Sequence, residues 1–190
     1  MNTIKKILFP IFSIFLGYRS IDLMRSLLST DPNEYTNIDI LILSSLLGIF
    51  ITGIFAFIGF AYPSSNILPD QYYKIKNPKV LNYTSKVLGI KYFQLLLLLF
   101  FWGWKKNRKK YFNGTKKGLA NFIYQTRQSE FGHLGAFIVI LIASFILLAY
   151  GYLLLVIPLT LINIFGNAYP VILQRMHRMR IEKITESNRN

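Results

Sequence analysis

The stretch INIFGNAYPVILQRMHRMRI, residues 162–181, begins inside an apolar segment and ends in a cluster of basic residues. One helix face carries the residues that recur in it at steps of three or four: Asn163, Asn167, Pro170, Gln174 and Arg178. Amide side chains inside a membrane helix are costly unless they have hydrogen-bond partners. We therefore predict that this face looks away from lipid. It either lines a cleft that opens at the membrane surface or packs by hydrogen bonds against neighbouring helices.

The composition of the chain is that of a membrane protein. Of its 190 residues, 53% are hydrophobic, 16% are aromatic and 16% are charged, and the length suits one domain, residues 1–190. The net charge of +14 comes from 22 basic and 8 acidic residues, and the basic ones flank apolar segments. Contact with anionic membrane lipid explains this pattern better than nucleic acid, which we do not expect as a partner. Because the chain has no cysteine, disulfides, cysteine-ligated metal sites and thiol catalysis are excluded.

Long apolar segments predict an all-α polytopic membrane protein with about four transmembrane helices, at residues 7–28, 40–62, 134–150 and 152–173. Segment 40–62 is uncharged throughout and is long enough to cross a hydrocarbon core of about 30 Å. Residues 134–173 are free of charge, and their length predicts two helices joined as a hairpin. Gly151, which lies between two tyrosines, is the expected turn.

Residues 90–104 are largely apolar but reach only about 22 Å as a helix, and basic residues flank them on both sides. We predict a short re-entrant or in-plane segment there, with Trp102 and Trp104 at the membrane interface. The loop 105–130 and the tail 175–190 are basic, whereas the loop 29–39 is acidic. The positive-inside rule therefore predicts that the basic loop and both termini are cytoplasmic.

Glu130 and His133 lie three residues apart, which puts a carboxylate and an imidazole on the same side of a helix. Such a pair suits general-base catalysis, because the carboxylate orients the ring and the ring takes a proton from a hydroxyl. The same spacing also occurs in metal-ligand pairs and in accidental surface pairs. A zinc site needs a third ligand, and His177 is the only other histidine, so we predict neither a metal nor a cofactor. Arg175 and Arg178 are suited to hold a phosphate or a carboxylate.

Three segments together resemble a known protein family. They are VLGIKYFQ at residues 87–94, EFGHLGAF at residues 130–137 and NIFGNAYPVILQRMHRMR at residues 163–180. The family is that of glycosyl-4,4'-diaponeurosporenoate acyltransferases, and the resemblance covers roughly residues 86–181. It implies a small integral protein of the bacterial plasma membrane. It also implies transfer of a fatty acyl group to a sugar hydroxyl of a glycosylated carotenoid, as in staphyloxanthin synthesis.

Two hypotheses of function follow. In the first, a membrane acyltransferase, His133 deprotonates the acceptor hydroxyl and Glu130 orients it, while Arg175 and Arg178 hold an anionic part of the substrates. The amides of Asn163, Asn167 and Gln174 bind substrate, with the last two donating hydrogen bonds to the developing oxyanion. The acyl donor is acyl-CoA, acyl carrier protein or phospholipid. In the second hypothesis the protein is a non-enzymatic membrane scaffold or lipid-binding protein, and the polar helix face is packing.

Overall fold

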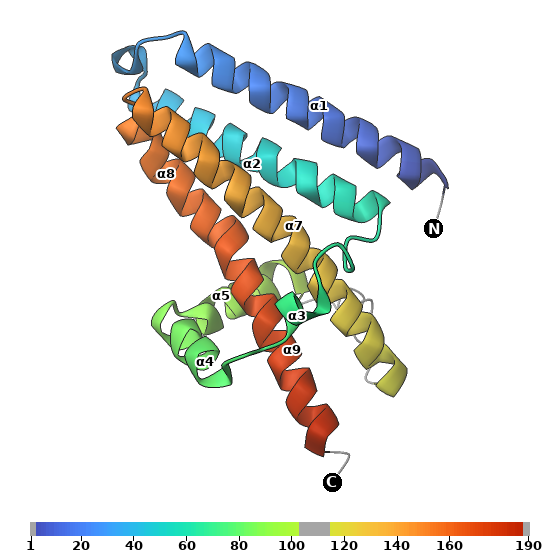
Figure 1. Ribbon diagram of the computed structural model, residues 1–190. Coiled ribbons are helices and arrows are strands. Elements are labelled where there is room, and N and C mark those ends of the chain that lie inside the picture. The colour runs from blue at the N-terminus through green and yellow to red at the C-terminus, as the bar shows by residue number, and fades with distance from the viewer. Residues whose placement is uncertain (1–2, 103–114, 188–190) are drawn as a thin grey trace. The chain divides into compact units, whose positions relative to one another are not determined.

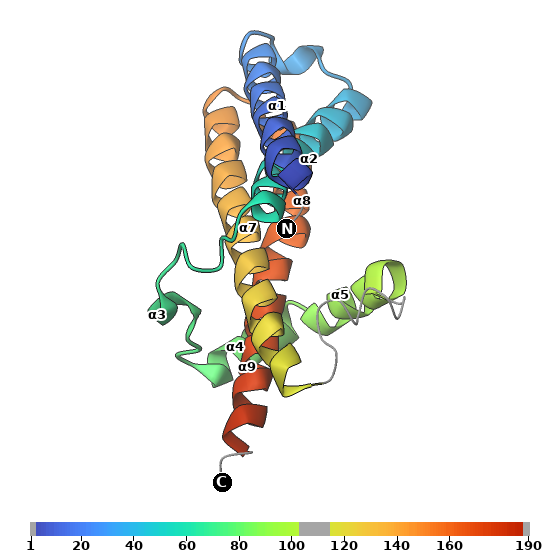
Figure 2. The same ribbon diagram turned by 90° about the vertical axis from the view of Figure 1, so that its right-hand side faces the viewer.

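A computed structural model describes residues 3–102 and 115–187 of the chain (Figures 1 and 2). All regular structure in these two ranges is helical, which confirms the all-α prediction. Four of the described helices are long and apolar enough to cross a membrane, at Ile4–Leu28, Asn37–Ala61, Gly118–Ala149 and Leu153–Lys183. The predicted interfacial Trp104 and most of the basic stretch 105–117 lie outside the described residues.

The helical contacts gather into two compact units, and each is described by itself. The first unit comprises Met1–Pro63 and Gly132–Ala168, and the second comprises Ser64–Phe131 and Tyr169–Asn190. In the first unit, α1 (Thr3–Leu28) and α2 (Asn37–Ala61) run side by side as an antiparallel pair (Figure 1). The C-terminal part of α7 (Lys116–Ala149) and the whole of α8 (Leu153–Asn163) complete this unit.

Local sequence signals set both turns of the first unit. Thr36 and Asp39 form a capping box at the start of α2, so the acidic loop also supplies the helix N-cap. Gly151 separates α7 from α8 and has φ 86°, a backbone conformation that glycine adopts without strain. The predicted hairpin turn is therefore confirmed. Next to it, the Tyr152 hydroxyl reaches the carbonyl oxygens of Leu27 and, at 2.6 Å, Thr30, which ties the end of α1 to the start of α8.

Glycine brings other helices close to α2. A β-carbon at Gly48 would lie 2.8 Å from Cγ2 of Ile162 on α8, and one at Gly53 would meet the side chain of Leu16 on α1. A β-carbon at Gly135 on α7 would overlap the ring of Phe55. Small residues at such crossings are typical of membrane helices, because close packing there replaces the hydrophobic effect as the source of association.

Replacing Gly135 with alanine should destabilise the protein. The new methyl group meets an aromatic ring rather than the end of a flexible chain, and overpacking of this kind typically costs about 1–3 kcal/mol. We expect the melting temperature of the purified protein to fall by several degrees, given about 2–4 °C per kcal/mol at this chain length. Gly59→Ala is the matched control, because nothing lies within 4 Å of a β-carbon there. Equal melting temperatures for the two variants would show that Phe55 gives way without cost.

The second unit contains the shorter helices: α3 (Asp70–Tyr73), α4 (Pro78–Val87) and α5 (Ile90–Leu97). Gly89 has φ 63° and lets the chain turn from α4 into α5. Ile90 at the start of α5 is buried against Leu173 and Met176 of α9 (Tyr169–Ser187). The predicted re-entrant segment 90–104 thus begins as α5 and continues as a π-helix, η2 (Leu98–Trp102). Its apolar helical part, Ile90–Phe100, is shorter than the four candidate membrane spans. That it does not cross the membrane stays a prediction.

Two helices extend beyond the spans predicted from hydropathy. Helix α7 begins at Lys116, so residues 116–130 of the predicted loop are helical, and α9 carries the basic tail as helix to Ser187. Hydropathy finds the part of a helix that suits lipid and not the polar turns that continue it.

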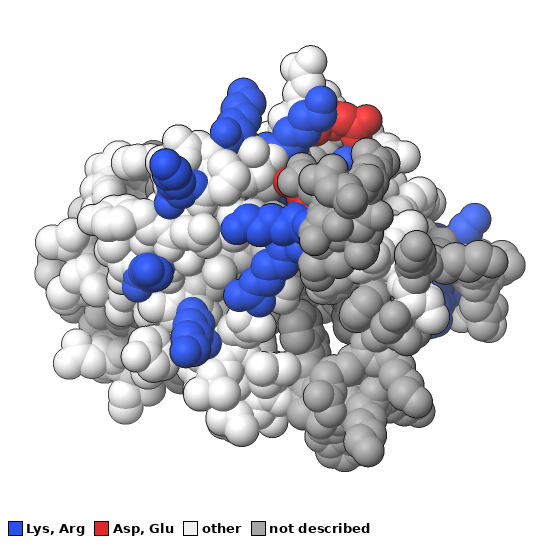
Figure 3. All heavy atoms as spheres, turned by 90° about the horizontal axis from the view of Figure 1, so that it is seen from below, with Lys and Arg blue, Asp and Glu red and all other residues white. Residues whose placement is uncertain are grey.

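Lys and Arg side chains are spread over the face of the molecule shown in Figure 3, with few acidic ones among them.

Candidate functional site

The polar face of residues 163–178 is buried, as predicted. The exposed fraction is 3% for Asn163, 0% for Asn167, 8% for Gln174 and 3% for Arg178. The face does not lie on one regular helix, because α8 passes into α9 through a π-helix, η3 (Ile164–Ala168). Pro170 has no N–H to offer the carbonyl four residues earlier, and the chain widens just before it. This wider turn was not predicted from the sequence.

In the first unit, His133 pairs with Asn167. Its Nδ1 lies 3.2 Å from Oδ1 of Asn167. The amide nitrogen of Asn167 donates to Oγ1 of Thr52 and to Oδ1 of Asn163, both at 3.1 Å. Asn163 in turn donates to the backbone carbonyl of Phe137 at 3.0 Å. Thr52 belongs to this network although nothing in the sequence distinguishes it from the other hydroxyl residues of its apolar segment.

The network ends at a backbone carbonyl, and this fixes which group donates and which accepts in each of its hydrogen bonds. A backbone carbonyl only accepts, so the contact with Phe137 must come from the NH₂ group of Asn163. The oxygen of Asn163 then accepts from Asn167, and the oxygen of Asn167 accepts from His133. In the neutral imidazole the hydrogen is therefore assigned to Nδ1, which leaves Nε2 with its lone pair. The ring of His133 also makes a hydrogen bond with the backbone of Gly166, so Asn167 and Gly166 together orient it.

In the second unit, Glu130 is completely buried and binds two arginines. Its Oε1 accepts from Nε of Arg175 at 2.8 Å, and its Oε2 accepts from Nη2 of Arg178. The carboxylate that the sequence paired with His133 is thus engaged by Arg175 and Arg178. Gln174 donates to Oγ of Ser129 at 3.2 Å. These contacts join α7 to α9, which chain spacing alone did not indicate.

Two adjacent tyrosines, Tyr72 and Tyr73, complete this cluster. The Arg175 guanidinium lies over the ring of Tyr72 at 4.8 Å, and that of Arg178 lies over the ring of Tyr73 at 5.3 Å. Burial raises the pKa of both tyrosine hydroxyls, and the charge of Glu130 raises it further. Both phenols therefore stay neutral at physiological pH and keep their hydrogen for donation. The sequence analysis did not single out these tyrosines, because they lie in a polar segment without helical periodicity.

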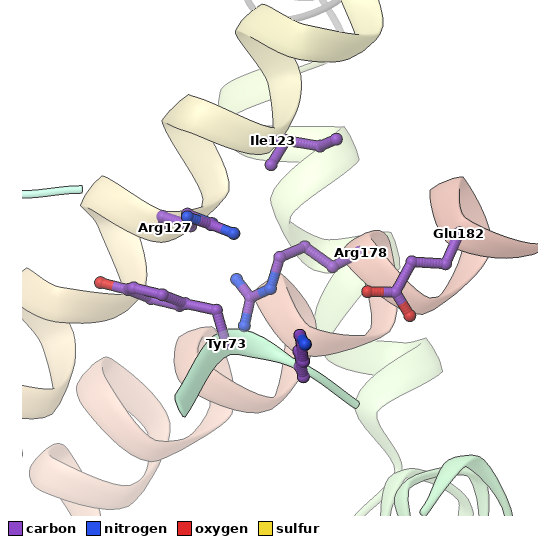
Figure 4. A pocket seen from close by; sticks show the side chains of 6 residues that line it. Tyr73, Ile123, Arg127, Arg178 and Glu182 are labelled. Carbon is purple, nitrogen blue, oxygen red and sulfur yellow. The ribbon is translucent and has the colours of Figure 1, made fainter. Parts of the chain in front are cut away.

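A pocket of about 110 Å³ opens beside the cluster (Figure 4). Its lining comprises Tyr73, Lys74, Ile123, Arg127, Arg178 and Glu182. Arg127 also lies over Tyr73, at 4.8 Å, and donates through Nη1 to Asp70 at 2.5 Å. Within residues 3–102 and 115–187, no three side chains of the kinds that ligate metals come together.

The predicted site residues therefore fall into two sets. His133, Asn163 and Asn167 are joined within the first unit, and Glu130, Gln174, Arg175 and Arg178 are gathered within the second. A family model for glycosyl-4,4'-diaponeurosporenoate acyltransferase matches residues 69–187, more than half of the chain and including both sets. Comparison with curated proteins and with solved structures gave no match.

Proposed function

The chain belongs to the glycosyl-4,4'-diaponeurosporenoate acyltransferase family, and from this premise we propose that it transfers a fatty acyl group to a hydroxyl of a lipid-like acceptor. The family description makes a glycosylated carotenoid the first acceptor to consider, with a sugar hydroxyl as the nucleophile. The donor is an acyl thioester, such as acyl-CoA or acyl carrier protein, or the ester of a phospholipid.

One observation supports this proposal most strongly: the hydrogen bond from Nδ1 of His133 to Asn167. With Nδ1 as the donor, Nε2 takes the proton of the acceptor hydroxyl while the oxygen attacks the acyl carbonyl carbon. The tetrahedral intermediate then expels the thiol or alcohol of the donor, which leaves with the proton that His133 returns. The products are the acylated acceptor and the free donor group, so the imidazole ends the cycle neutral.

The amide network makes Asn167 a positioning residue in this scheme. Both of its amide hydrogens are used, by Thr52 and by Asn163, so none remains for an oxyanion. The oxyanion role expected for Asn167 therefore gives way to orientation of His133. Asn163 and Thr52 fix the amide of Asn167 in turn. In other acyl-transfer enzymes a carboxylate orients the catalytic histidine in the same way.

Glu130 has a different part in the proposal from the one the sequence indicated. Its carboxylate holds Arg175 and Arg178 on α9 and balances one of their two charges. We propose that these arginines bind the anionic part of the acyl donor or of the acceptor. Gln174 donates only one hydrogen to Ser129, so the other is available to substrate.

The protein is a membrane protein, and we propose that it is a multi-pass protein of the bacterial plasma membrane with both termini cytoplasmic. The acidic loop 29–39 is then external, and the basic loop 105–130 and the tail face the cytoplasm. This orientation gives the basic segments access to anionic lipid and to soluble acyl donors.

Lipid mass spectrometry of cells with and without this protein tests the proposed activity. Cells that make a glycosylated carotenoid should contain its acylated form only when the protein is present, with a mass increase of one fatty acyl group. A general search for lipids that gain an acyl group covers other acceptors. Identical lipid profiles would contradict acyl transfer and favour a scaffold or lipid-binding protein.

A further inference from the structure

The pocket in the second unit is lined by hydrogen-bond donors that have no acceptor. Arg178 donates a hydrogen bond through Nη2 to Glu130, while its Nε and Nη1 are buried without a partner among the described residues. Arg127 donates through Nη1 to Asp70, and its Nε is likewise buried and unpaired within that part of the chain. A buried donor without an acceptor costs about 1–3 kcal/mol, more when it is charged. Such donors are rare in native proteins, and their gathering at one pocket calls for an acceptor.

The charges around the pocket indicate the sign of that acceptor. Lys74, Arg127 and Arg178 line it, against one acidic residue, Glu182. Asp70 and Glu130 pair with the arginines from outside the lining, and Arg175 shares Glu130. Four cations therefore face three carboxylates, and two of these, Asp70 and Glu182, are exposed to water, which screens their charge. The buried side of the pocket is positive.

The close view shows how the donors are arranged. The guanidinium of Arg178 extends from α9 toward the space between Arg127, on α7, and the ring of Tyr73 (Figure 4). Lys74 follows Tyr73 directly in the chain, so the donors approach from three separate segments. Arg178 is 3% exposed, and its head group is therefore held by packing rather than free to swing into solvent. A preorganised array of this kind suits an anion with several acceptor oxygens, because two carboxylate oxygens cannot serve so many donors.

The size of the pocket limits the ligand. Its volume of about 110 Å³ is several times the roughly 10–15 Å³ that a cavity needs to hold one water. It is well below the roughly 300–1,000 Å³ of sites that enclose a drug-sized molecule. A single tetrahedral anion fits, while an attached nucleotide, sugar or acyl chain must lie outside.

We infer that this pocket binds the terminal phosphate of a phosphate monoester, with Arg178 and Arg127 donating to its oxygens, the ring of Tyr73 forming one wall and Lys74 closing the exposed side. The source is either the head group of a lipid such as phosphatidic acid or a soluble phosphate ester. The inference rests on the proposed function only where it assigns that phosphate to a donor or acceptor of the acyl group. Binding itself requires no turnover.

Inorganic phosphate is the first probe, titrated calorimetrically into the full-length protein in a phosphate-free maltoside detergent. We expect saturable binding to the wild type that Arg127→Gln weakens about tenfold or more, as loss of a charge-assisted hydrogen bond does. Lys74→Gln should weaken it by a smaller factor, because this side chain is exposed. Lys76→Gln makes the same change of charge nearby but outside the lining, and it should leave the affinity unchanged.

The second probe distinguishes the two sources. In phosphatidylcholine nanodiscs, phosphatidic acid added to the bilayer should displace bound phosphate if the ligand is a lipid. Glycerol 3-phosphate, and not the lipid, should displace it if the ligand is soluble. The His133→Ala variant should bind phosphate like the wild type, so a failed phosphate site and a failed acyltransferase are told apart. No saturable binding by the wild type, or equal affinities for Arg127→Gln and Lys76→Gln, would overturn the inference.

Discussion

Replacing His133 with alanine should slow acyl transfer by a factor on the order of 10²–10⁴, while the protein still inserts and accumulates. The expected loss is that of a general base, since alanine has no group that can take the proton of the acceptor hydroxyl. The measurement is the rate at which the acylated acceptor forms, by lipid mass spectrometry, per amount of membrane-inserted protein. His177→Ala is the matched control, because it removes the only other histidine and should leave the rate near that of the wild type.

The hydrogen-bond network gives this prediction a second readout. Asn167→Leu removes the acceptor of the Nδ1 hydrogen, so the ring loses its fixed tautomer and the rate should fall, though less than for His133→Ala. Asn167→Asp keeps an acceptor at that position and should retain more activity than the leucine variant. A His133→Ala protein that forms product at the wild-type rate would make the histidine structural and remove the basis of the proposed mechanism.

Replacing Glu130 with glutamine should be the most destabilising conservative change in the second unit. It leaves Arg178, which is 3% exposed, without a counter-charge, and breaking a buried ion pair from one side typically costs about 3–5 kcal/mol. Arg175 is one-third exposed and is partly rescued by water. At about 2–4 °C per kcal/mol for a chain of this size, the melting temperature should fall on the order of 10 °C.

Asp70→Asn is the control for this loss, because it makes the same carboxylate-to-amide change in an arginine pair that is exposed. Asp70 is 78% exposed, and pairs of this kind contribute about 0–1 kcal/mol. The double variant Glu130→Leu with Arg178→Met removes both charges and should be more stable than Glu130→Gln alone. If the Glu130→Gln protein had the melting temperature of the wild type, Arg178 would have to reach water or another anion.

Much of the fold follows from local sequence signals. Uninterrupted apolar runs located the long helices, and Gly151 located the hairpin turn because few other residues adopt its backbone conformation. The burial of Asn163 and Asn167 followed from the cost of placing an amide against lipid. Each of these inferences needs only neighbouring residues and the solvent around them.

The partners within the site could not be predicted in the same way. Periodicity offered Glu130 a partner three residues away, whereas its arginines lie 45 and 48 residues along the chain. That pairing depends on how α7 and α9 pack, and helical spacing within one segment carries no information about it. Thr52 was missed for the same reason, since it acquires its role from a side chain on another element.

The discontinuity of both units bears on how the protein is made. The first unit needs residues up to Ala168 and the second needs the C-terminal helix, so neither is complete when its first segment leaves the ribosome. Glu130 is synthesised 48 residues before Arg178, an interval of roughly 2–10 s at typical translation rates. During that time a carboxylate destined for a fully buried position lacks both of the arginines that pair with it in the folded protein. The nascent chain must keep Glu130 in contact with water until α9 emerges, which makes the order of synthesis a constraint on membrane insertion.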